Sequence, residues 1–100
     1  MPSIEFTSRA FITLESLPQS LGFGLVRLSE LLRENSKLGV LIRIRNAPSK
    51  KYRQLILRRT HRLICEIDEI EDRIYVVAIQ HCRQKLPSPR DLKRDEARDE

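Results

Sequence analysis

The sequence contains no tryptophan, only three glycines and only short apolar runs. A helix that crosses a membrane needs about 20 consecutive apolar residues, so we expect no membrane segment. Met1–Glu5 lacks the basic start and the apolar stretch of a secretory signal, and we therefore expect a cytoplasmic protein. With 100 residues, 40% of them hydrophobic, the chain is long enough for one domain with its own core.

Cysteine is also scarce, since Cys65 and Cys82 are the two in the chain. They are too few and too far apart for a zinc motif. His81 and Cys82 are neighbours, and neighbouring residues on a strand point to opposite faces of the sheet. We therefore expect no metal site and no cofactor.

Acidic residues are absent between Arg43 and Arg62, where eight lysines and arginines occur. The net charge is +5, but residues 88–100 hold four basic and five acidic side chains, so the remaining body has 15 against 9, or +6. A basic stretch of this kind is typical of a nucleic-acid surface. A solvated sheet edge that resists aggregation explains it equally well.

A short strand and two helices are predicted in the N-terminal part of the chain. Ile4–Thr7 has apolar residues at alternate positions, as in a strand. Thr7 or Ser8 is a suitable N-cap for a helix that ends near Leu17. Pro18 fits the first turn of a second helix, where its missing N–H is not needed.

The second helix is predicted to pack through one apolar stripe. Its leucines recur at the spacing of a single helix face: Leu21, Leu25, Leu28 and Leu32. Gly39 is then expected just past the C-cap of this helix. The two helices should form a hairpin that is apolar on one side.

The chain after Pro48 is predicted to form a sheet. Three segments rich in Ile, Leu, Val and Tyr read as strands: Tyr52–Leu57, Arg62–Asp68 and Ile74–Arg83. The acidic residues 69–72 form the turn between the last two. The fold class is therefore α+β, with a helical hairpin packed on a small, mostly antiparallel sheet. Residues 1–87 make one domain, and residues 88–100 form a charged tail that is flexible or a frayed helix.

Side-chain sorting suggests a register for the last two strands. If Ile67 lies opposite Ile74, then Cys65 opposes Val76 and Arg62 opposes Ile79. One face then holds small or apolar residues and suits the core: Leu63, Cys65, Ile67, Ile74, Val76, Ala78 and Cys82. The two cysteines are about 20 Å apart along the strands, too far for a disulfide. Both should be free, buried thiols.

The same register gathers Arg62, His81 and Arg83 on the other face. Guanidinium groups bind phosphates and stabilise charge that develops on phosphorus. A histidine that titrates near neutral pH can move a proton to or from a ribose oxygen. This set suits cleavage of an RNA backbone by its own 2′-hydroxyl, a reaction that needs no metal. A polar, solvent-facing edge without function is the alternative.

These segments resemble a known family. YRQLILRRTHRLICEID at 52–68, followed by IYVVAIQHCR at 74–83, is similar to the RelE/ParE superfamily of bacterial toxins. There a strand carrying an arginine is followed by a polar hairpin and a last strand that ends in a His-x-Arg or Gly-x-Arg signature. The helical segments FTSRA at 6–10, LESLP at 14–18 and LLRENSKLG at 31–39 also match the style of the family. The resemblance spans about residues 4–86.

The resemblance implies a βααβββ fold, which agrees with the predicted elements, and it implies roles for single residues. Arg62 takes the place of the arginine that holds the scissile phosphate, Arg83 that of a second arginine, and His81 that of a histidine found in many relatives. These three are the candidate catalytic residues. The candidate RNA- or phosphate-binding residues are Lys50, Lys51, Arg53, Arg58 and Arg59.

Two departures from the family pattern weaken the catalytic assignment. Leu86 stands where some members have a catalytic tyrosine, and a leucine cannot transfer a proton. Leu55 stands where the ribonucleases often have a basic residue. His61 and Cys65 replace aromatic residues that flank the arginine, a change that we expect to affect packing.

Three functions are therefore kept open. The first is the toxin of a type II toxin–antitoxin system, a RelE-like, ribosome-dependent mRNA endoribonuclease that blocks translation. The second is a ParE-like inhibitor that binds DNA gyrase and needs no catalytic residues. The third is a degenerate toxin that only binds its antitoxin. The expected partners are a cognate antitoxin and either the ribosome with its mRNA or DNA gyrase.

Overall fold

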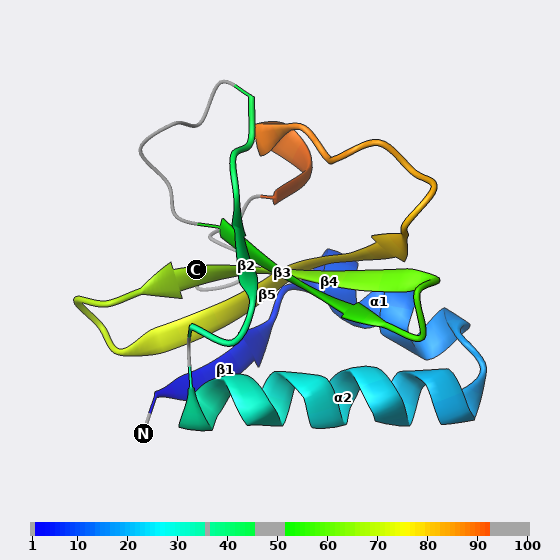
Figure 1. The fold of residues 1–100 in the computed structure, drawn as a ribbon, viewed down its shortest axis with the longest axis horizontal. Coiled ribbons are helices and arrows are strands. Elements are labelled where there is room, and N and C mark those ends of the chain that lie inside the picture. The colour runs from blue at the N-terminus through cyan, green and yellow to red at the C-terminus, as the bar shows by residue number, and fades with distance from the viewer. Residues whose placement is uncertain (1, 36, 46–51, 93–100) are drawn as a thin grey trace.

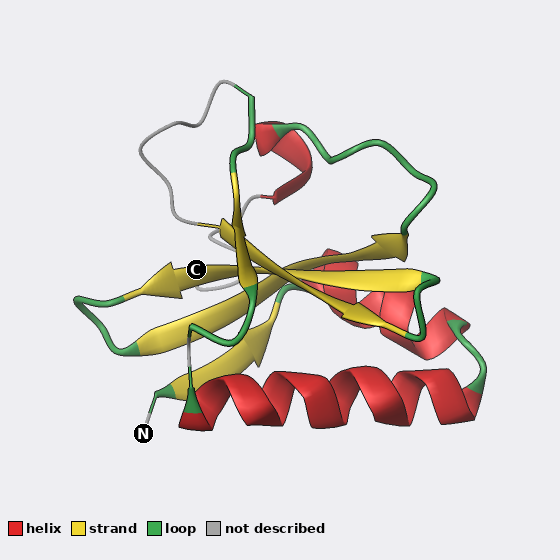
Figure 2. Ribbon diagram, viewed as in Figure 1, coloured by secondary structure: helices red, strands yellow, loops and turns green. Residues whose placement is uncertain are grey.

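Residues 2–35, 37–45 and 52–92 are described by the computed structural model. The chain begins with strand β1 (Ser3–Phe6) and the helices α1 (Ser8–Ser16) and α2 (Gln19–Glu34). Four strands follow: β2 (Val40–Ile42), β3 (Tyr52–Leu57), β4 (His61–Asp68) and β5 (Arg73–His81). A short 3-10 helix, η1 (Pro89–Leu92), comes last. Figure 2 shows these elements by type.

The strands form one mixed sheet in the order β1-β5-β4-β3-β2. β1 runs parallel to β5, and the other neighbours are antiparallel. The predicted α+β class, with a helical hairpin on a mostly antiparallel sheet, is confirmed. The sheet has one strand more than predicted, because Val40–Ile42 pairs with β3 as an edge strand.

The helices begin where the sequence indicated. Thr7 caps α1, and its Oγ1 accepts a hydrogen bond from the Ala10 amide at 3.3 Å. Pro18 is the N-cap of α2 rather than a residue of its first turn, a shift of one position from the prediction. Leu21, Leu25 and Leu32 are buried, and Leu28 packs beside them, so the predicted apolar stripe is confirmed.

Both helices cover one face of the sheet (Figure 1). The first core lies between the helices and the sheet. It includes Leu25, Leu63, Cys65 and Ile74, all fully buried. Burial raises the pKa of the Cys65 thiol well above its ordinary value. Apolar side chains that leave water here supply the main favourable term in folding, roughly 1.5–3 kcal/mol for each large residue.

Gly39 has a different role from the one predicted. Helix α2 ends at Glu34 with Asn35 as its C-cap, four residues earlier than Gly39. A Cβ at Gly39 would lie 2.9 Å from Leu55 Cδ1 and 3.0 Å from the Gln54 carbonyl oxygen. The glycine is therefore required because the chain passes close to β3 as it enters β2.

The predicted register holds for one half of the β4–β5 pair. Ile67 pairs with Ile74 and Cys65 with Val76, as expected, but Ile64 pairs with Ala78. Val77 is therefore an extra residue in β5, a β-bulge that moves every later side chain to the other face. Arg62 consequently pairs with Gln80 and not with Ile79.

Because of the bulge, the predicted positions of three residues in the sheet are wrong. Ala78 belongs to the second core and Ile79 to the first, the reverse of the prediction. Strand β5 ends at His81, and Cys82 lies half-buried in the turn that follows instead of on the core face. Both thiols are free.

The second face of the sheet carries a smaller core. Tyr52, Ile64 and Val77 pack there against Ile44 and Leu92, which is 1% exposed. Figure 1 shows η1 on the side of the sheet opposite the helices. The start of the predicted tail is thus packed against the sheet. The domain boundary after residue 87 stays a prediction, and residues 93–100 lie outside the described part.

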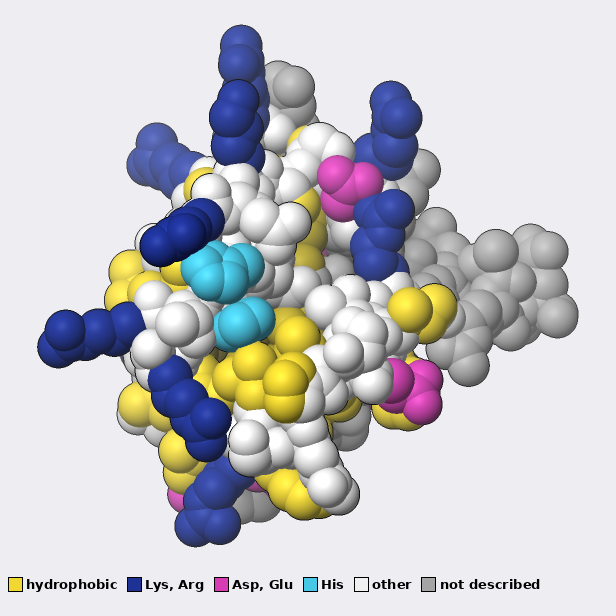
Figure 3. Space-filling model, turned by 90° about the vertical axis from the view of Figure 1, so that its right-hand side faces the viewer, with side chains coloured by type: hydrophobic (Ala, Val, Ile, Leu, Met, Phe, Trp, Pro, Cys, Tyr) yellow, Lys and Arg dark blue, Asp and Glu magenta, His cyan; other side chains and the backbone are white. Residues whose placement is uncertain are grey.

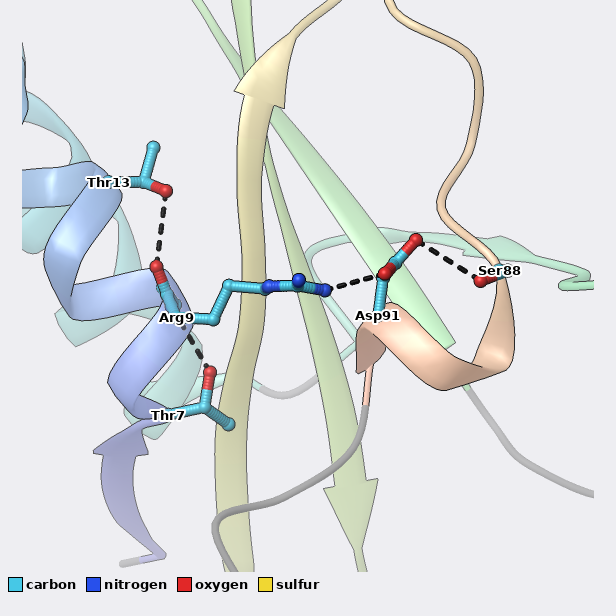
Figure 4. A network of polar contacts seen from close by, with 6 residues as sticks. Thr7, Arg9, Thr13, Ser88 and Asp91 are labelled. Atoms are coloured by element: carbon cyan, nitrogen blue, oxygen red, sulfur yellow. Dashed lines mark hydrogen bonds and ion pairs between the residues drawn. The ribbon is translucent and has the colours of Figure 1, made fainter.

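An ion pair joins η1 to α1. Arg9 Nη1 lies 2.6 Å from Asp91 Oδ1, and the Ser88 hydroxyl donates to the other carboxylate oxygen at 3.1 Å (Figure 4). The hydrogen bonds from Arg9 and Ser88 hold the pKa of Asp91 below its ordinary value. A contact between residues that are far apart in the sequence therefore links η1, the last described element, to α1.

No helix in the described ranges is long and apolar enough to cross a membrane. The same residues contain no group of three or more His, Cys, Asp or Glu side chains arranged to hold a metal ion.

Candidate functional site

The candidate residues that the structure describes gather mainly at one end of the sheet. There the β3–β4 turn, residues 58–60, meets the turn that follows β5, residues 82–86. The Cys82 amide donates to the Thr60 carbonyl at 2.7 Å and joins the two turns. Figure 3 looks at this end and shows both histidines, with lysine and arginine side chains around them. We call it the basic end.

Arg62 is held in place by the end of β5 and by the turn that follows it. Its Nε donates to Gln80 Oε1 at 2.7 Å, and its Nη2 donates to the Gln84 carbonyl at 2.6 Å. The Gln80 amide in turn donates to the Lys85 carbonyl at 3.2 Å. Hydrogen bonds from a charged donor to fixed acceptors orient the guanidinium before any ligand arrives.

His61 and His81 form a cross-strand pair. Their ring centroids are 5.1 Å apart with an interplanar angle of 66°, an edge-to-face contact. Both rings are half-buried at the ends of their strands. The pKa of His61 is lowered, first by burial and then by positive charge on His81.

The two histidines lie on the helix side of the sheet, whereas Arg62 lies on the other side. His61 is two residues before Leu63, and His81 is two residues after Ile79, and both of these apolar residues belong to the first core. Arg62 alternates with them. The prediction that Arg62 and His81 share a face is wrong, because the bulge at Val77 changes the register between them.

Arg83 follows β5 in the exposed turn and lies outside the strand that was predicted to contain it. Its backbone amide donates to His81 Nδ1 at 3.0 Å, so its main chain rather than its side chain has the described contact with the histidine. The guanidinium is exposed at the basic end.

The predicted phosphate-binding residues divide into three groups. Arg58 and Arg59 are exposed in the β3–β4 turn with φ of 54° and 62°. Arg53 lies on the helix side of β3, where its Nη1 donates to the Gly39 carbonyl at 2.7 Å, away from Arg62. Lys50 and Lys51 lie outside the described residues.

The left-handed conformation of Arg58 and Arg59 is unfavourable for residues with a Cβ. It costs about 1–2 kcal/mol per residue, and β-turns with positive φ at both central residues usually contain Asn-Gly. The turn closes with a hydrogen bond from the Thr60 amide to the Leu57 carbonyl at 3.2 Å. Two cationic side chains are therefore held at the tip of the hairpin in spite of the backbone cost.

A groove of about 480 Å³ lies beside the Arg62 network. It runs between α1, the end of β5 and η1, and its lining includes Arg9, Gln80, Gln84, Lys85, Leu86 and Asp91. Leu86, whose position the sequence resemblance compared with a tyrosine of some toxins, is 42% exposed. The groove is open and has polar walls.

Three residues of this site were not predicted from the sequence. Gln80 and Gln84 position Arg62, and a glutamine by itself gives no signal for such a role. His61 was assigned to packing, and its pairing with His81 depends on the bulge. The apolar run from Ile74 to Ile79 hides that bulge, because these residues are buried on both faces of the sheet.

Several solved structures share this fold. The isolated E. coli RelE toxin superposes with a TM-score of 0.69 and 15% sequence identity, over 85% of this chain and 88% of that one. A chain of the intact E. coli RelBE toxin–antitoxin complex gives 0.68 and 15%, over 84% and 100%. The RelBE2 toxin–antitoxin complex of Mycobacterium tuberculosis gives 0.63 and 24%, over 83% and 93%. No protein-family model and no curated protein sequence matches the chain. The chain therefore has a RelE-like toxin fold.

Proposed function

We propose that this chain is the toxin of a type II toxin–antitoxin system and that it cuts mRNA on the ribosome. The observation that carries this proposal is the RelE-like fold, which extends over more than four fifths of the chain. The basic end supports it, because exposed arginines and a fixed guanidinium suit the RNA backbone.

The proposed reaction is attack of an RNA 2′-hydroxyl on the adjacent phosphorus. The 2′-oxygen forms a bond to phosphorus, the bond to the 5′-oxygen breaks, and a 2′,3′-cyclic phosphate and a 5′-hydroxyl result. Arg62 is already oriented by Gln80 and Gln84, so it can bind a phosphate oxygen without reorganising.

The proposed partner in the cell is a cognate antitoxin. The RelE and RelBE2 structures that share the fold include complexes with antitoxins. The acid-free stretch from Arg43 to Arg62 favours an acidic antitoxin segment. Its affinity should fall when the salt concentration rises, because exposed charge pairs are screened.

Two assays on the purified full chain test the proposal. Translating ribosomes with a defined mRNA are incubated with the protein, and primer extension maps the new 5′ ends. Relaxed plasmid with DNA gyrase and ATP is incubated with the same protein, and supercoiling is followed on a gel. Cleavage of ribosome-bound mRNA with normal gyrase activity supports the proposal. Gyrase inhibition without cleavage contradicts it and favours the ParE-like alternative.

A growth-arrest assay distinguishes an active toxin from the remaining alternative, a degenerate toxin that only binds its antitoxin. Induction of the intact chain should stop growth, and co-expression of the neighbouring antitoxin frame should restore it. A chain that binds the antitoxin but neither cuts mRNA nor arrests growth is a degenerate toxin.

A further inference from the structure

His61 and His81 lie so close together that one ligand can contact both rings. The β4–β5 register places the two residues directly opposite each other, and the rings touch edge to face at 5.1 Å. Figure 3 shows the two imidazoles side by side at the surface of the basic end, with the acidic side chains of this view farther away. A ligand that reaches one ring therefore reaches the other.

Neighbouring groups occupy one nitrogen of each ring. The Arg83 amide donates to His81 Nδ1 at 3.0 Å, so neutral His81 carries its hydrogen on Nε2 and presents a donor there. His61 Nδ1 lies 3.0 Å from Thr60 Oγ1. When Nδ1 donates to this hydroxyl, His61 Nε2 has a free lone pair and presents an acceptor.

The pair in this arrangement offers one acceptor nitrogen and one donor nitrogen to the same ligand. A ribose 2′-hydroxyl beside its phosphate has the complementary groups, since the hydroxyl donates a hydrogen bond and the phosphate oxygens accept one. The surrounding charges also favour a phosphate: Arg58 and Arg59 come from the β3–β4 turn and Arg83 from the turn after β5.

Burial and the neighbouring ring favour the neutral form of His61. Its pKa is lowered by the loss of hydration and by any positive charge on His81. A general base must be neutral at the working pH to accept a proton, and a lowered pKa keeps it so in mildly acidic solution. The electrostatics therefore agree with the role that the hydrogen bonds indicate.

We propose that His61 is the general base of the RNA cleavage reaction and that His81 binds the phosphate beside it. This inference rests on the proposed function. His61 Nε2 takes the proton of the 2′-hydroxyl as the 2′-oxygen bonds to phosphorus. The bond from phosphorus to the 5′-oxygen breaks with its electron pair, and the leaving oxygen takes a proton from water. His61 then returns its proton to the solvent, and no electrons are exchanged with another reactant.

His81 takes part in this step through its Nε2. Its Nε2–H donates to a non-bridging phosphate oxygen as negative charge develops there, while the Arg83 amide fixes the ring through Nδ1. Thr60 is a positioning residue, because its hydroxyl lies 3.0 Å from His61 Nδ1 and, in the proposed arrangement, accepts a hydrogen bond that holds the His61 ring.

The test measures the first-order rate of mRNA cleavage on translating ribosomes from pH 5 to pH 8.5. His61→Gln should lower the rate by about 10²- to 10⁴-fold, the usual contribution of a general base. The wild-type rate should rise with pH as His61 loses its proton, and this rise should be absent in the variant. Free imidazole should restore part of the activity of His61→Ala.

Thr60→Val keeps the shape of the side chain and removes the hydroxyl. It should lower the rate by roughly 2- to 10-fold, as for the loss of one hydrogen bond, and should move the rising part of the pH profile. Ser16→Ala is the matched control, because it removes one exposed side-chain hydrogen bond on α1, from Ser16 Oγ to the Thr13 carbonyl. It should leave the rate and the profile unchanged.

Two outcomes overturn the inference, and they are distinguishable. If the wild type cuts mRNA and folded His61→Gln cuts it at the same rate with the same pH profile, His61 is not the base and the proposed function stands. If the wild type cuts no ribosome-bound mRNA, the proposed function fails and the inference fails with it. Melting curves show that each variant is folded.

Discussion

The two ends of the sheet differ in charge and in the types of residue that adopt positive φ, although β4 and β5 reach both. At one end the β4–β5 turn is acidic, with Glu69, Glu71 and Asp72, and we call it the acidic end. The basic end has Arg58 and Arg59 in the corresponding position of the β3–β4 hairpin.

Both turns contain residues with positive φ, but the residue types differ. Asp72 has a φ of 54°, and aspartate adopts this conformation more readily than most residues. Asp68 Oδ1 also accepts hydrogen bonds from the amides of Ile70 and Glu71, both at 3.1 Å, so the acidic turn is locally well formed. Arg58 and Arg59 have no such advantage. Strain that persists without local compensation is typical of functional sites, which supports the basic end as the candidate site.

Removal of an arginine should reveal the largest difference between the two ends, measured as the rate of mRNA cleavage. Arg62→Ala should reduce mRNA cleavage by about 10²- to 10³-fold, because one preorganised charge donor is lost. It should also lower the free energy of unfolding by about 1–2 kcal/mol, because the hydrogen bonds to Gln80 and Gln84 are lost. Arg73→Ala, an exposed arginine at the acidic end, is the control and should cleave normally. Equal losses in the two variants would show that the position of the charge is unimportant.

The strained turn can be relaxed directly. Replacement of Arg58 and Arg59 by Asn-Gly should raise the free energy of unfolding by about 1–2 kcal/mol, because these residues favour the left-handed conformation. Urea denaturation measures the gain. The same variant should cleave mRNA more slowly, since two cations leave the basic end. Asp72→Gly at the acidic end should change stability by less than about 0.5 kcal/mol. A double variant that is no more stable than the wild type would disprove the strain.

A smaller effect is expected from Asp68, which organises the acidic turn. Asp68→Ala should lower the free energy of unfolding by about 1 kcal/mol, because the amides of Ile70 and Glu71 lose their acceptor. Asp68→Asn keeps a side-chain oxygen and should retain most of the stability. Cleavage of mRNA should be unaffected by either change. A marked loss of cleavage would mean that the acidic end also takes part in function.

The smallest expected effect is on the pH dependence of stability, through His61 at the basic end. The folded-state pKa of His61 is below its ordinary value of 6.5, so the unfolded chain binds this proton more readily. The stability contributed by neutral His61 is therefore present above 6.5 and is lost as the pH falls through 6.5 toward the lower folded value. Chemical denaturation between pH 7 and pH 5 should show a weaker pH dependence in His61→Gln than in the wild type. Identical slopes would contradict the direction of the shift.

Local patterns in the sequence were sufficient for most of the fold. The leucine spacing of α2, the Thr7 cap and the acidic turn at 69–72 each depend on neighbouring residues, and each was predicted correctly. β2 was missed because three residues give too little alternation to identify a strand. Its position depends on a close approach to β3 at Gly39, which is a tertiary contact.

The candidate site was less predictable than the fold. Arg62 was predicted as a candidate residue, but its partners were not, because Gln80 lies in β5 beyond the bulge and Gln84 lies in the turn after β5, whose shape the sequence does not encode locally. One extra residue, Val77, decides which face His81 occupies. A period of two cannot reveal a bulge where both faces of the sheet are buried.

The parallel pairing of β1 with β5 also affects how the chain folds during synthesis. Ser3 pairs with Arg73, seventy positions later, whereas β3, β4 and β5 are consecutive antiparallel neighbours. Contacts between distant residues form late, because a long loop must close first. We expect β1 to remain without its partner on the ribosome until β5 has left the exit tunnel. The sheet, and with it the first core, is therefore completed only after β5 has emerged.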